Sequence, residues 1–181
     1  MKGIIFTEFL AFAEDRHGDD FVDDLIFHAK LPGKGVYTSV GTYDFSELAK
    51  LLGLYCQFTG SKAPDILRLF GKYLVGAFSR KWPDIFVRYG GTIELLNQVE
   101  DNIHVEVKKL YPDAQLPTFK TIEIRKNSIV MDYASCRSLS DLATGLISGV
   151  ADHYHENVEI LTESVDFADR PTVRFHVEIR S

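Results

Sequence analysis

The hydrophobic period of the chain changes after residue 114, and this change restricts the possible folds more than any other feature. Before it, apolar side chains recur at the three- and four-residue spacing of amphipathic helices. After it, residues 118–136 and 158–180 alternate apolar and polar side chains and predict two hairpins, with a helix over 138–156 between them. We therefore predict an α+β fold, with a helical N-terminal lobe and a C-terminal lobe that holds a four-stranded antiparallel sheet and helices.

The composition excludes several classes of partner. The net charge is −6 and no long basic run occurs, so we expect no binding to nucleic acid or to anionic membrane. The start, MKGIIFTEFLAFAEDR, predicts an amphipathic helix and not a signal peptide, and no stretch is long and apolar enough to span a bilayer. Cys56 and Cys136 form no CxxC pair, which is typical of a reduced, cytoplasmic protein.

One histidine stands out on the best-marked predicted helix, residues 93–114. At 100° per residue, His104 lies at the edge of an apolar arc of about 140°. Most histidines in such a place are partly buried core residues. No set of zinc ligands accompanies it, so a metal bound to His104 must bring its remaining ligands. Haem does so, because the porphyrin supplies four nitrogens and the protein adds one axial imidazole.

The segment MDYASCR, residues 131–137, places polar side chains at alternate positions. In an extended strand, Tyr133, Ser135 and Arg137 point to one face. Such a face is commonly just the solvated side of an antiparallel strand. The same three hydrogen-bond donors also suit a carboxylate ligand, and haem carries two propionates.

These segments resemble a known family. The stretches MKGIIFTEFL, IHVEVKKLYPDAQLP and YASCR, and more loosely GLISGVADHYHENV, are similar in kind and order to the haem nitric oxide/oxygen-binding (H-NOX) domain, the module also found in soluble guanylate cyclase. The likeness covers essentially the whole chain. It implies a single domain over 1–181, with a distal lobe over about 1–65, a proximal lobe over 66–181, and haem b (iron protoporphyrin IX) between them.

The resemblance also implies roles for individual residues. His104 matches the proximal iron ligand, and Tyr133, Ser135 and Arg137 match the propionate-binding residues. Pro117 matches the proline that presses on the porphyrin, although a proline just before a strand explains it equally well. The positions that match the distal wall are all apolar: Ile5, Phe9, Leu74, Phe78, Leu142 and Leu146.

The apolar wall predicts which gas binds. Family members that hold dioxygen carry a distal tyrosine at the position of Leu142. A buried donor stabilises bound dioxygen by about 1.5–3 kcal/mol, whereas nitric oxide needs no such donor. We therefore predict a nitric oxide sensor that also binds CO and excludes dioxygen, unless Tyr73 or Tyr55 reaches the pocket.

The resemblance to stand-alone bacterial members predicts how the signal leaves the chain. Nitric oxide would break the bond between iron and His104, and the resulting movement would regulate a partner in trans. That partner would be a sensor histidine kinase of two-component signalling, or a diguanylate cyclase or phosphodiesterase of cyclic-di-GMP signalling. The chain itself would not be an enzyme.

Three other interpretations remain open. An enzyme could use the cluster His153-Tyr154-His155-Glu156, although a cluster at a helix end favours a structural role. A haem-based oxygen or redox sensor could use Cys56 or Cys136 as a thiol switch, but we expect Cys136 to be a small buried hydrophobe. A haem carrier would bind haem without any gas-dependent effect on a partner.

Overall fold

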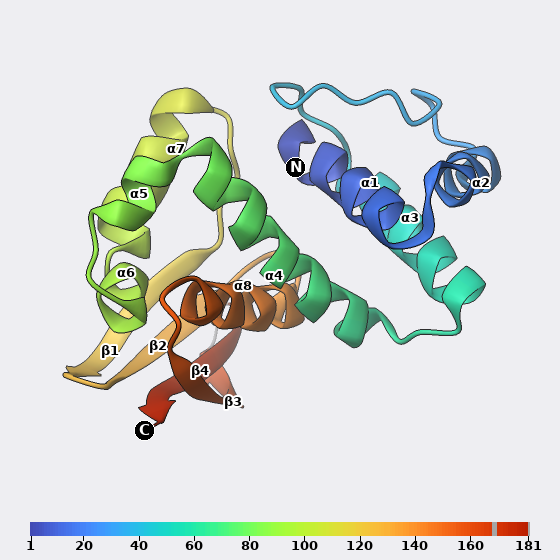
Figure 1. Cartoon of the computed structure of the whole chain (residues 1–181). Coiled ribbons are helices and arrows are strands. Elements are labelled where there is room, and N and C mark those ends of the chain that lie inside the picture. Colours follow the sequence, from blue (N-terminus) through green and yellow to red (C-terminus); the bar gives the residue numbers. More distant parts are fainter. Residues whose placement is uncertain (168–169, 181) are drawn as a thin grey trace. The chain divides into compact units, whose positions relative to one another are not determined.

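The computed structural model describes residues 1–167 and 170–180, and the chain divides into two compact units, Met1–Phe70 and Gly71–Ser181 (Figure 1). Helix α4 (Ala63–Lys81) contributes residues to both units. The division follows Phe70, a few residues after the predicted lobe boundary. The assignment of residues 1–181 to a single domain stays a prediction. No helix in the described residues is long and apolar enough to cross a membrane.

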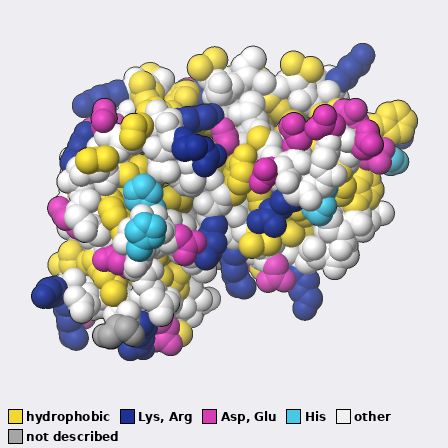
Figure 2. Space-filling view, viewed as in Figure 1, with side chains coloured by type: hydrophobic (Ala, Val, Ile, Leu, Met, Phe, Trp, Pro, Cys, Tyr) yellow, Lys and Arg dark blue, Asp and Glu magenta, His cyan; other side chains and the backbone are white. Residues whose placement is uncertain are grey.

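The first unit is helical around an aromatic core. It contains α1 (Gly3–His17), α2 (Asp19–Ala29), α3 (Phe45–Thr59) and the start of α4. The side chain of Asp44 caps α3 by accepting the Ser46 N–H at 2.7 Å. The rings that fill the core are fully buried: Phe6, Phe9, Phe12 and Phe70. Figure 2 shows acidic side chains gathered over the surface where α2 lies, which begins with Asp19 and Asp20.

The second unit combines helices with one sheet. After α4 come α5 (Pro83–Val87), α6 (Thr92–Asn97), the π-helix η1 (Val99–Ile103) and α7 (His104–Leu110). The strands are β1 (Thr118–Arg125), β2 (Ser128–Ala134), β3 (Asn157–Phe167) and β4 (Arg170–Arg180), and α8 (Ser140–His153) precedes β3. The sheet has the order β1-β2-β4-β3 with antiparallel pairs throughout. The predicted mixture of helices with a four-stranded antiparallel sheet is confirmed.

Helix α8 covers one face of the sheet (Figure 1). Its Ala143 and Ile147 pack in one buried cluster with sheet residues from β2 and β4: Ile129, Met131, Tyr133, Phe175 and Val177. The alternation that predicted the strands therefore has a physical cause, because every second side chain of β2 and β4 faces this helix.

Two glycines let α4 and α8 approach closely. A Cβ atom on Gly71 would lie 2.5 Å from the Leu142 carbonyl oxygen and 2.6 Å from the Leu146 backbone nitrogen. A Cβ atom on Gly149 would lie 2.9 Å from the Cβ of Val75. All three distances are shorter than a carbon atom tolerates, so the two helices touch almost backbone to backbone. This contact fixes the candidate wall residues of α4 and α8 against one another.

The predicted helix over 93–114 is wrong as a single element. Helix α6 ends at Asn97, and the N–H groups of Asn102 and Ile103 both donate to the Gln98 carbonyl at 3.1 Å. This wider turn breaks the 100° rotation per residue that the helical wheel assumes. Leu110, the last residue of α7, is 62% exposed.

The close helix contact can be tested by adding one methyl group. We expect Gly149→Ala to lower the free energy of unfolding by about 1–3 kcal/mol, because the new Cβ overlaps Val75. Gly53→Ala is the matched control: it also lies within a helix, no atom lies within 4 Å of its added Cβ, and the change should stabilise the protein by up to about 1 kcal/mol. Urea unfolding of both variants measures the effects. Equal stabilisation by both changes would contradict the observed helix spacing.

Candidate functional site

His104 opens helix α7 directly after the π-helical turn η1. Its side chain is 12% exposed, and its Nδ1 lies 3.1 Å from Oε2 of Glu100. Burial lowers the pKa of His104, and the Glu100 carboxylate opposes that shift. A buried imidazole that stays neutral near pH 7 is the form that binds a metal, through the nitrogen not occupied by the carboxylate.

Glu100 joins His104 to the sheet. The same Oε2 atom also accepts the backbone N–H of Phe119 at 3.0 Å, near the start of β1. Nearby, the Thr121 hydroxyl donates to the Asn97 side chain at 3.0 Å, so α6 and η1 are tied to β1 at two points. The sequence prediction missed Glu100. Its position four residues before a helical histidine was the available signal, because i and i+4 side chains meet on a helix.

A row of aromatic rings leads from His104 to Tyr133. The rings of His104 and Phe119 have centroids 5.9 Å apart, and those of Phe119 and Tyr133 are 5.2 Å apart. Phe119 and Tyr133 are also directly opposed in the pairing of β1 with β2. Burial raises the pKa of Tyr133, while hydrogen bonds with Ser135 and the Leu139 backbone lower it. The phenol is therefore a neutral donor at physiological pH.

The prediction that Tyr133, Ser135 and Arg137 share one strand face is wrong for the last two. Strand β2 ends at Ala134, and the chain then turns, with the Ser135 hydroxyl accepting the Arg137 N–H at 3.2 Å. The three side chains are nevertheless close, because Ser135 contacts Tyr133 and the charge of Arg137 acts on the Tyr133 phenol. The turn, and not strand alternation, brings them together.

Arg137 also holds the segment that contains Pro117. Its guanidinium donates to the Gln115 carbonyl at 3.0 Å and to the Gln115 side-chain oxygen at 2.8 Å. Pro117 directly precedes β1, as its pre-strand interpretation requires, and is partly buried. Its role against a porphyrin stays a prediction.

The apolar wall residues are placed as follows. Phe9 is buried in the first unit beside the rings of Phe12, Tyr55 and Phe70, and Ile5 of the same helix is partly buried. In the second unit, Leu74 and Leu142 are buried. Phe78 and Leu146 are half-buried against a shared apolar cluster, and their helices, α4 and α8, meet at the Gly71 contact. The structure thus brings the α4 and α8 members together.

These residues fit a haem group. The described residues contain no group of three or more His, Cys, Asp and Glu side chains that could hold a metal ion. A metal on His104 therefore has to supply its other ligands itself, as the porphyrin does. Tyr133, Ser135 and Arg137 supply neutral and charged donors of the kind that bind carboxylates.

Comparison with known families identifies the family of this chain. The sequence profile of the haem-NO-binding domain matches residues 2–162. The chain belongs to the H-NOX family. H-NOX domains are haem-binding gas-sensor domains, and the fold of this H-NOX chain agrees with solved members of the family.

Three solved structures illustrate the similarity. The Fe(II) unliganded H-NOX protein from K. algicida is 38% identical, with a TM-score of 0.92 over 100% of this chain and 97% of that chain. The H-NOX protein from S. oneidensis in the Fe(II)NO ligation state is 25% identical, with a TM-score of 0.91 over 100% of both chains. An oxygen-binding H-NOX domain related to soluble guanylate cyclases, solved as its oxygen complex, is 22% identical and shares the fold, with a TM-score of 0.85 over 100% of this chain and 96% of that chain.

The cluster considered for an enzyme serves as a structural joint in this H-NOX chain. Tyr154 donates to the Phe86 carbonyl at 2.6 Å, and Glu156 accepts the Thr92 N–H at 2.8 Å. The His153 ring packs on Phe86 with centroids 4.8 Å apart. These contacts tie the end of α8 to α5 and α6.

The two cysteines differ in their environments. Burial raises the pKa of Cys56, which disfavours the reactive thiolate. Cys136 is exposed in the turn after β2, so the expectation that it is buried is wrong. The reason is again the early end of the strand.

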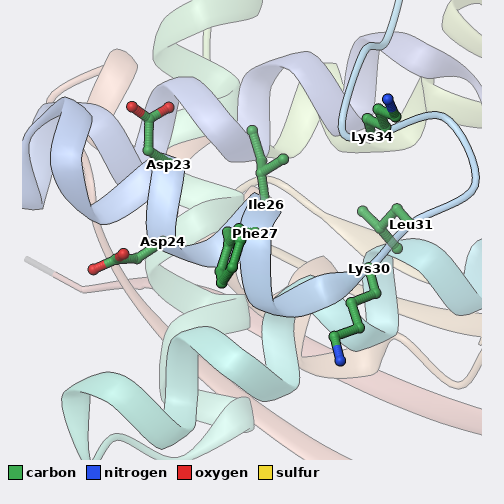
Figure 3. A pocket seen from close by; sticks show the side chains of 7 residues that line it. All are labelled: Asp23, Asp24, Ile26, Phe27, Lys30, Leu31 and Lys34. Atoms are coloured by element: carbon green, nitrogen blue, oxygen red, sulfur yellow. The ribbon is translucent and has the colours of Figure 1, made fainter.

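A shallow hollow on the first unit contains none of the residues predicted to bind haem. It is formed by α2 and the loop after it, and Figure 3 shows its lining side chains: Asp23, Asp24, Ile26, Phe27, Lys30, Leu31 and Lys34. Its lysines and aspartates carry charges that water can solvate, and none of the residues predicted to contact haem lines it.

The structural role of Tyr154 gives a testable expectation. Tyr154→Phe should lower the free energy of unfolding by about 1–2 kcal/mol at pH 8, because the Phe86 carbonyl loses its donor. Burial raises the pKa of Tyr154 from 10.0 to about 12, with Glu94 and Glu156 contributing. The folded state thus favours the neutral phenol, and the wild type should lose this contribution as the pH rises from about 10 to 12.

The two proteins should therefore converge in stability across that pH range. Guanidinium unfolding at pH 8, 10 and 11 measures the difference. Parallel stability curves for the variant and the wild type would contradict the role given to this hydroxyl.

Proposed function

We propose that this H-NOX chain is a haem-based nitric oxide sensor that excludes dioxygen and regulates a signalling partner in trans. The observation that carries the proposal is the His104 imidazole, whose side chain is only 12% exposed and whose Nδ1 lies 3.1 Å from a carboxylate oxygen, so that iron would bind the other ring nitrogen. The similarity to an H-NOX protein solved in the Fe(II)NO ligation state supports the choice of nitric oxide.

The haem would be haem b, held without a covalent bond to the chain. His104 would be the axial ligand, and Tyr133, Ser135 and Arg137 would bind the propionates. When bound, ferrous haem supplies the coordination site for a diatomic gas. Arg137 would reach the propionates from the turn that already holds Gln115, and this contact would tie the segment with Pro117 to the propionate-binding residues.

The side chains of the wall support selectivity for nitric oxide. Dioxygen depends on a buried hydrogen-bond donor far more than nitric oxide or CO does. The predicted wall, Ile5, Phe9, Leu74, Phe78, Leu142 and Leu146, offers none. The Tyr55 hydroxyl is 2.7 Å from Nε2 of His17, so that phenol already has a partner within the first unit.

His104 would carry the signal. Nitric oxide weakens the bond trans to itself, and release of His104 would change the contacts of η1 and α7 with β1. A ligand shifts such an equilibrium only through its different affinity for the two states. The output would act on a sensor histidine kinase or on a diguanylate cyclase or phosphodiesterase, with the chain acting as a cytoplasmic regulator and not as an enzyme.

Absorption spectra of the purified ferrous protein test the proposal directly. We expect the protein to be coloured or to become so with hemin, to give the same spectrum in nitrogen and in air, and to change on addition of CO or NO. His104→Ala should lose the axial ligand and give a different spectrum in nitrogen. A protein that stays colourless with hemin, or an air-stable oxy spectrum of the ferrous protein, would refute the proposal.

Leu142→Tyr tests the basis of gas selectivity. A buried phenol donor at this position should raise dioxygen affinity by about 10–100-fold, because a hydrogen bond to a charged acceptor contributes about 1.5–3 kcal/mol. Leu142→Phe is the matched control, since it adds the ring without the hydroxyl and should leave dioxygen affinity low. Titration with dioxygen measures both. If the wild type binds dioxygen and Tyr73→Phe abolishes that binding, Tyr73 is the donor and the selectivity proposal fails.

A further inference from the structure

We propose that Glu100 is the positioning residue that fixes the tautomer of His104 and strengthens its bond to iron, and that it links this bond to the first strand of the sheet. The inference rests on the proposed role of His104 as the axial ligand. It deepens that role by naming the group that controls the ligand.

The tautomer follows from the two contacts of one oxygen atom. Glu100 Oε2 lies 3.1 Å from His104 Nδ1 and 3.0 Å from the Phe119 backbone nitrogen. An ionised carboxylate can only accept hydrogen bonds, so Nδ1 must carry the hydrogen. Nε2 then carries the lone pair and is the nitrogen that can bind a metal.

A carboxylate in this position also changes the strength of the metal bond. A metal-bound histidine that donates its other N–H to a carboxylate becomes a more basic ligand with a fixed ring orientation. The Glu100 side chain is 37% exposed and the His104 side chain 12% exposed, so water screens this contact only in part. Glu100 should therefore resist the release of His104.

The second contact extends the effect to the sheet. Phe119 faces Tyr133 across the β1–β2 pair, and their rings are 5.2 Å apart. Since the imidazole and the Phe119 amide share one acceptor atom, His104 cannot withdraw without changing the hydrogen bond that holds the start of β1. The proposed propionate ligand Tyr133 lies directly beside that strand.

A purely structural brace is the competing interpretation. In that case Glu100 would only hold the Phe119 amide, and the imidazole would be a passive neighbour. Glu100→Gln separates the two roles, because a glutamine oxygen still accepts the amide N–H but lacks the negative charge. Glu106→Gln is the matched control: it removes a carboxylate two residues beyond His104 that pairs instead with Arg88 at 2.9 Å.

Resonance Raman spectra of the ferrous holoproteins measure the iron–histidine bond. We expect the iron–histidine stretch to shift to lower frequency in Glu100→Gln and to stay at the wild-type value in Glu106→Gln. Transfer of haem to apomyoglobin should be about 10-fold faster for Glu100→Ala than for wild type. A wild-type stretching frequency in Glu100→Gln would overturn the positioning role.

Nuclear magnetic resonance of the haem-free protein provides an independent readout. The wild-type His104 ring should show a protonated Nδ1 and an unprotonated Nε2, and the Phe119 amide should exchange faster with solvent in Glu100→Ala. The opposite tautomer in the wild type would overturn the inference even if haem binds. If the wild type does not bind haem at all, the proposed function fails. The tautomer of His104 in the haem-free protein still tests whether Glu100 sets it.

Discussion

One oxygen atom of Glu100 holds the proposed haem ligand and the first strand of the sheet in a fixed relation. It accepts from both the His104 ring and the Phe119 amide, at 3.1 and 3.0 Å. The remaining parts of the candidate site are arranged along β1 and the segment before it. Tyr133 faces Phe119, and Arg137 binds Gln115 just upstream of the strand. The site is therefore an arrangement around the start of one strand, and its geometry depends on how that strand is anchored.

The sheet could be predicted from the sequence because its pattern has a local cause. Val173, Phe175, Val177 and Ile179 alternate strictly, and all four belong to or pack against the cluster under α8. A shift of one residue in strand pairing would move this entire set to the opposite face of the sheet. The alternating hydrophobic pattern therefore specifies the pairing register. The helices around the aromatic core of the first unit follow from the same kind of one-sided burial.

The geometry of the site could not be predicted in the same way, because tertiary hydrogen bonds set it. A wheel of 100° per residue assumes an unbroken helix, but two amides share the Gln98 carbonyl in η1. Likewise, alternation continues to Arg137, although β2 has no partner beyond Ala134, which pairs with Thr172. The turn that follows includes Ser138 at φ 49°, a conformation that the alternating pattern does not reveal. The sequence indicated which residue types form the site, but not the backbone conformation that positions them.

The two sides of the proposed pocket within the second unit differ in how firmly they are built. Helix α8 buries seven of its residues against α4 and the sheet, and its glycine contact with α4 leaves no room for adjustment. Helix α7 and η1 bury no residue fully. Segments with few buried contacts open at lower free energy than packed helices. A change at the iron should therefore move η1 and α7 with His104, while Leu142 and Leu146 keep their places. If the proposed function holds, the wall would set which gas binds, and the loosely packed turn that carries His104 would convert binding into movement.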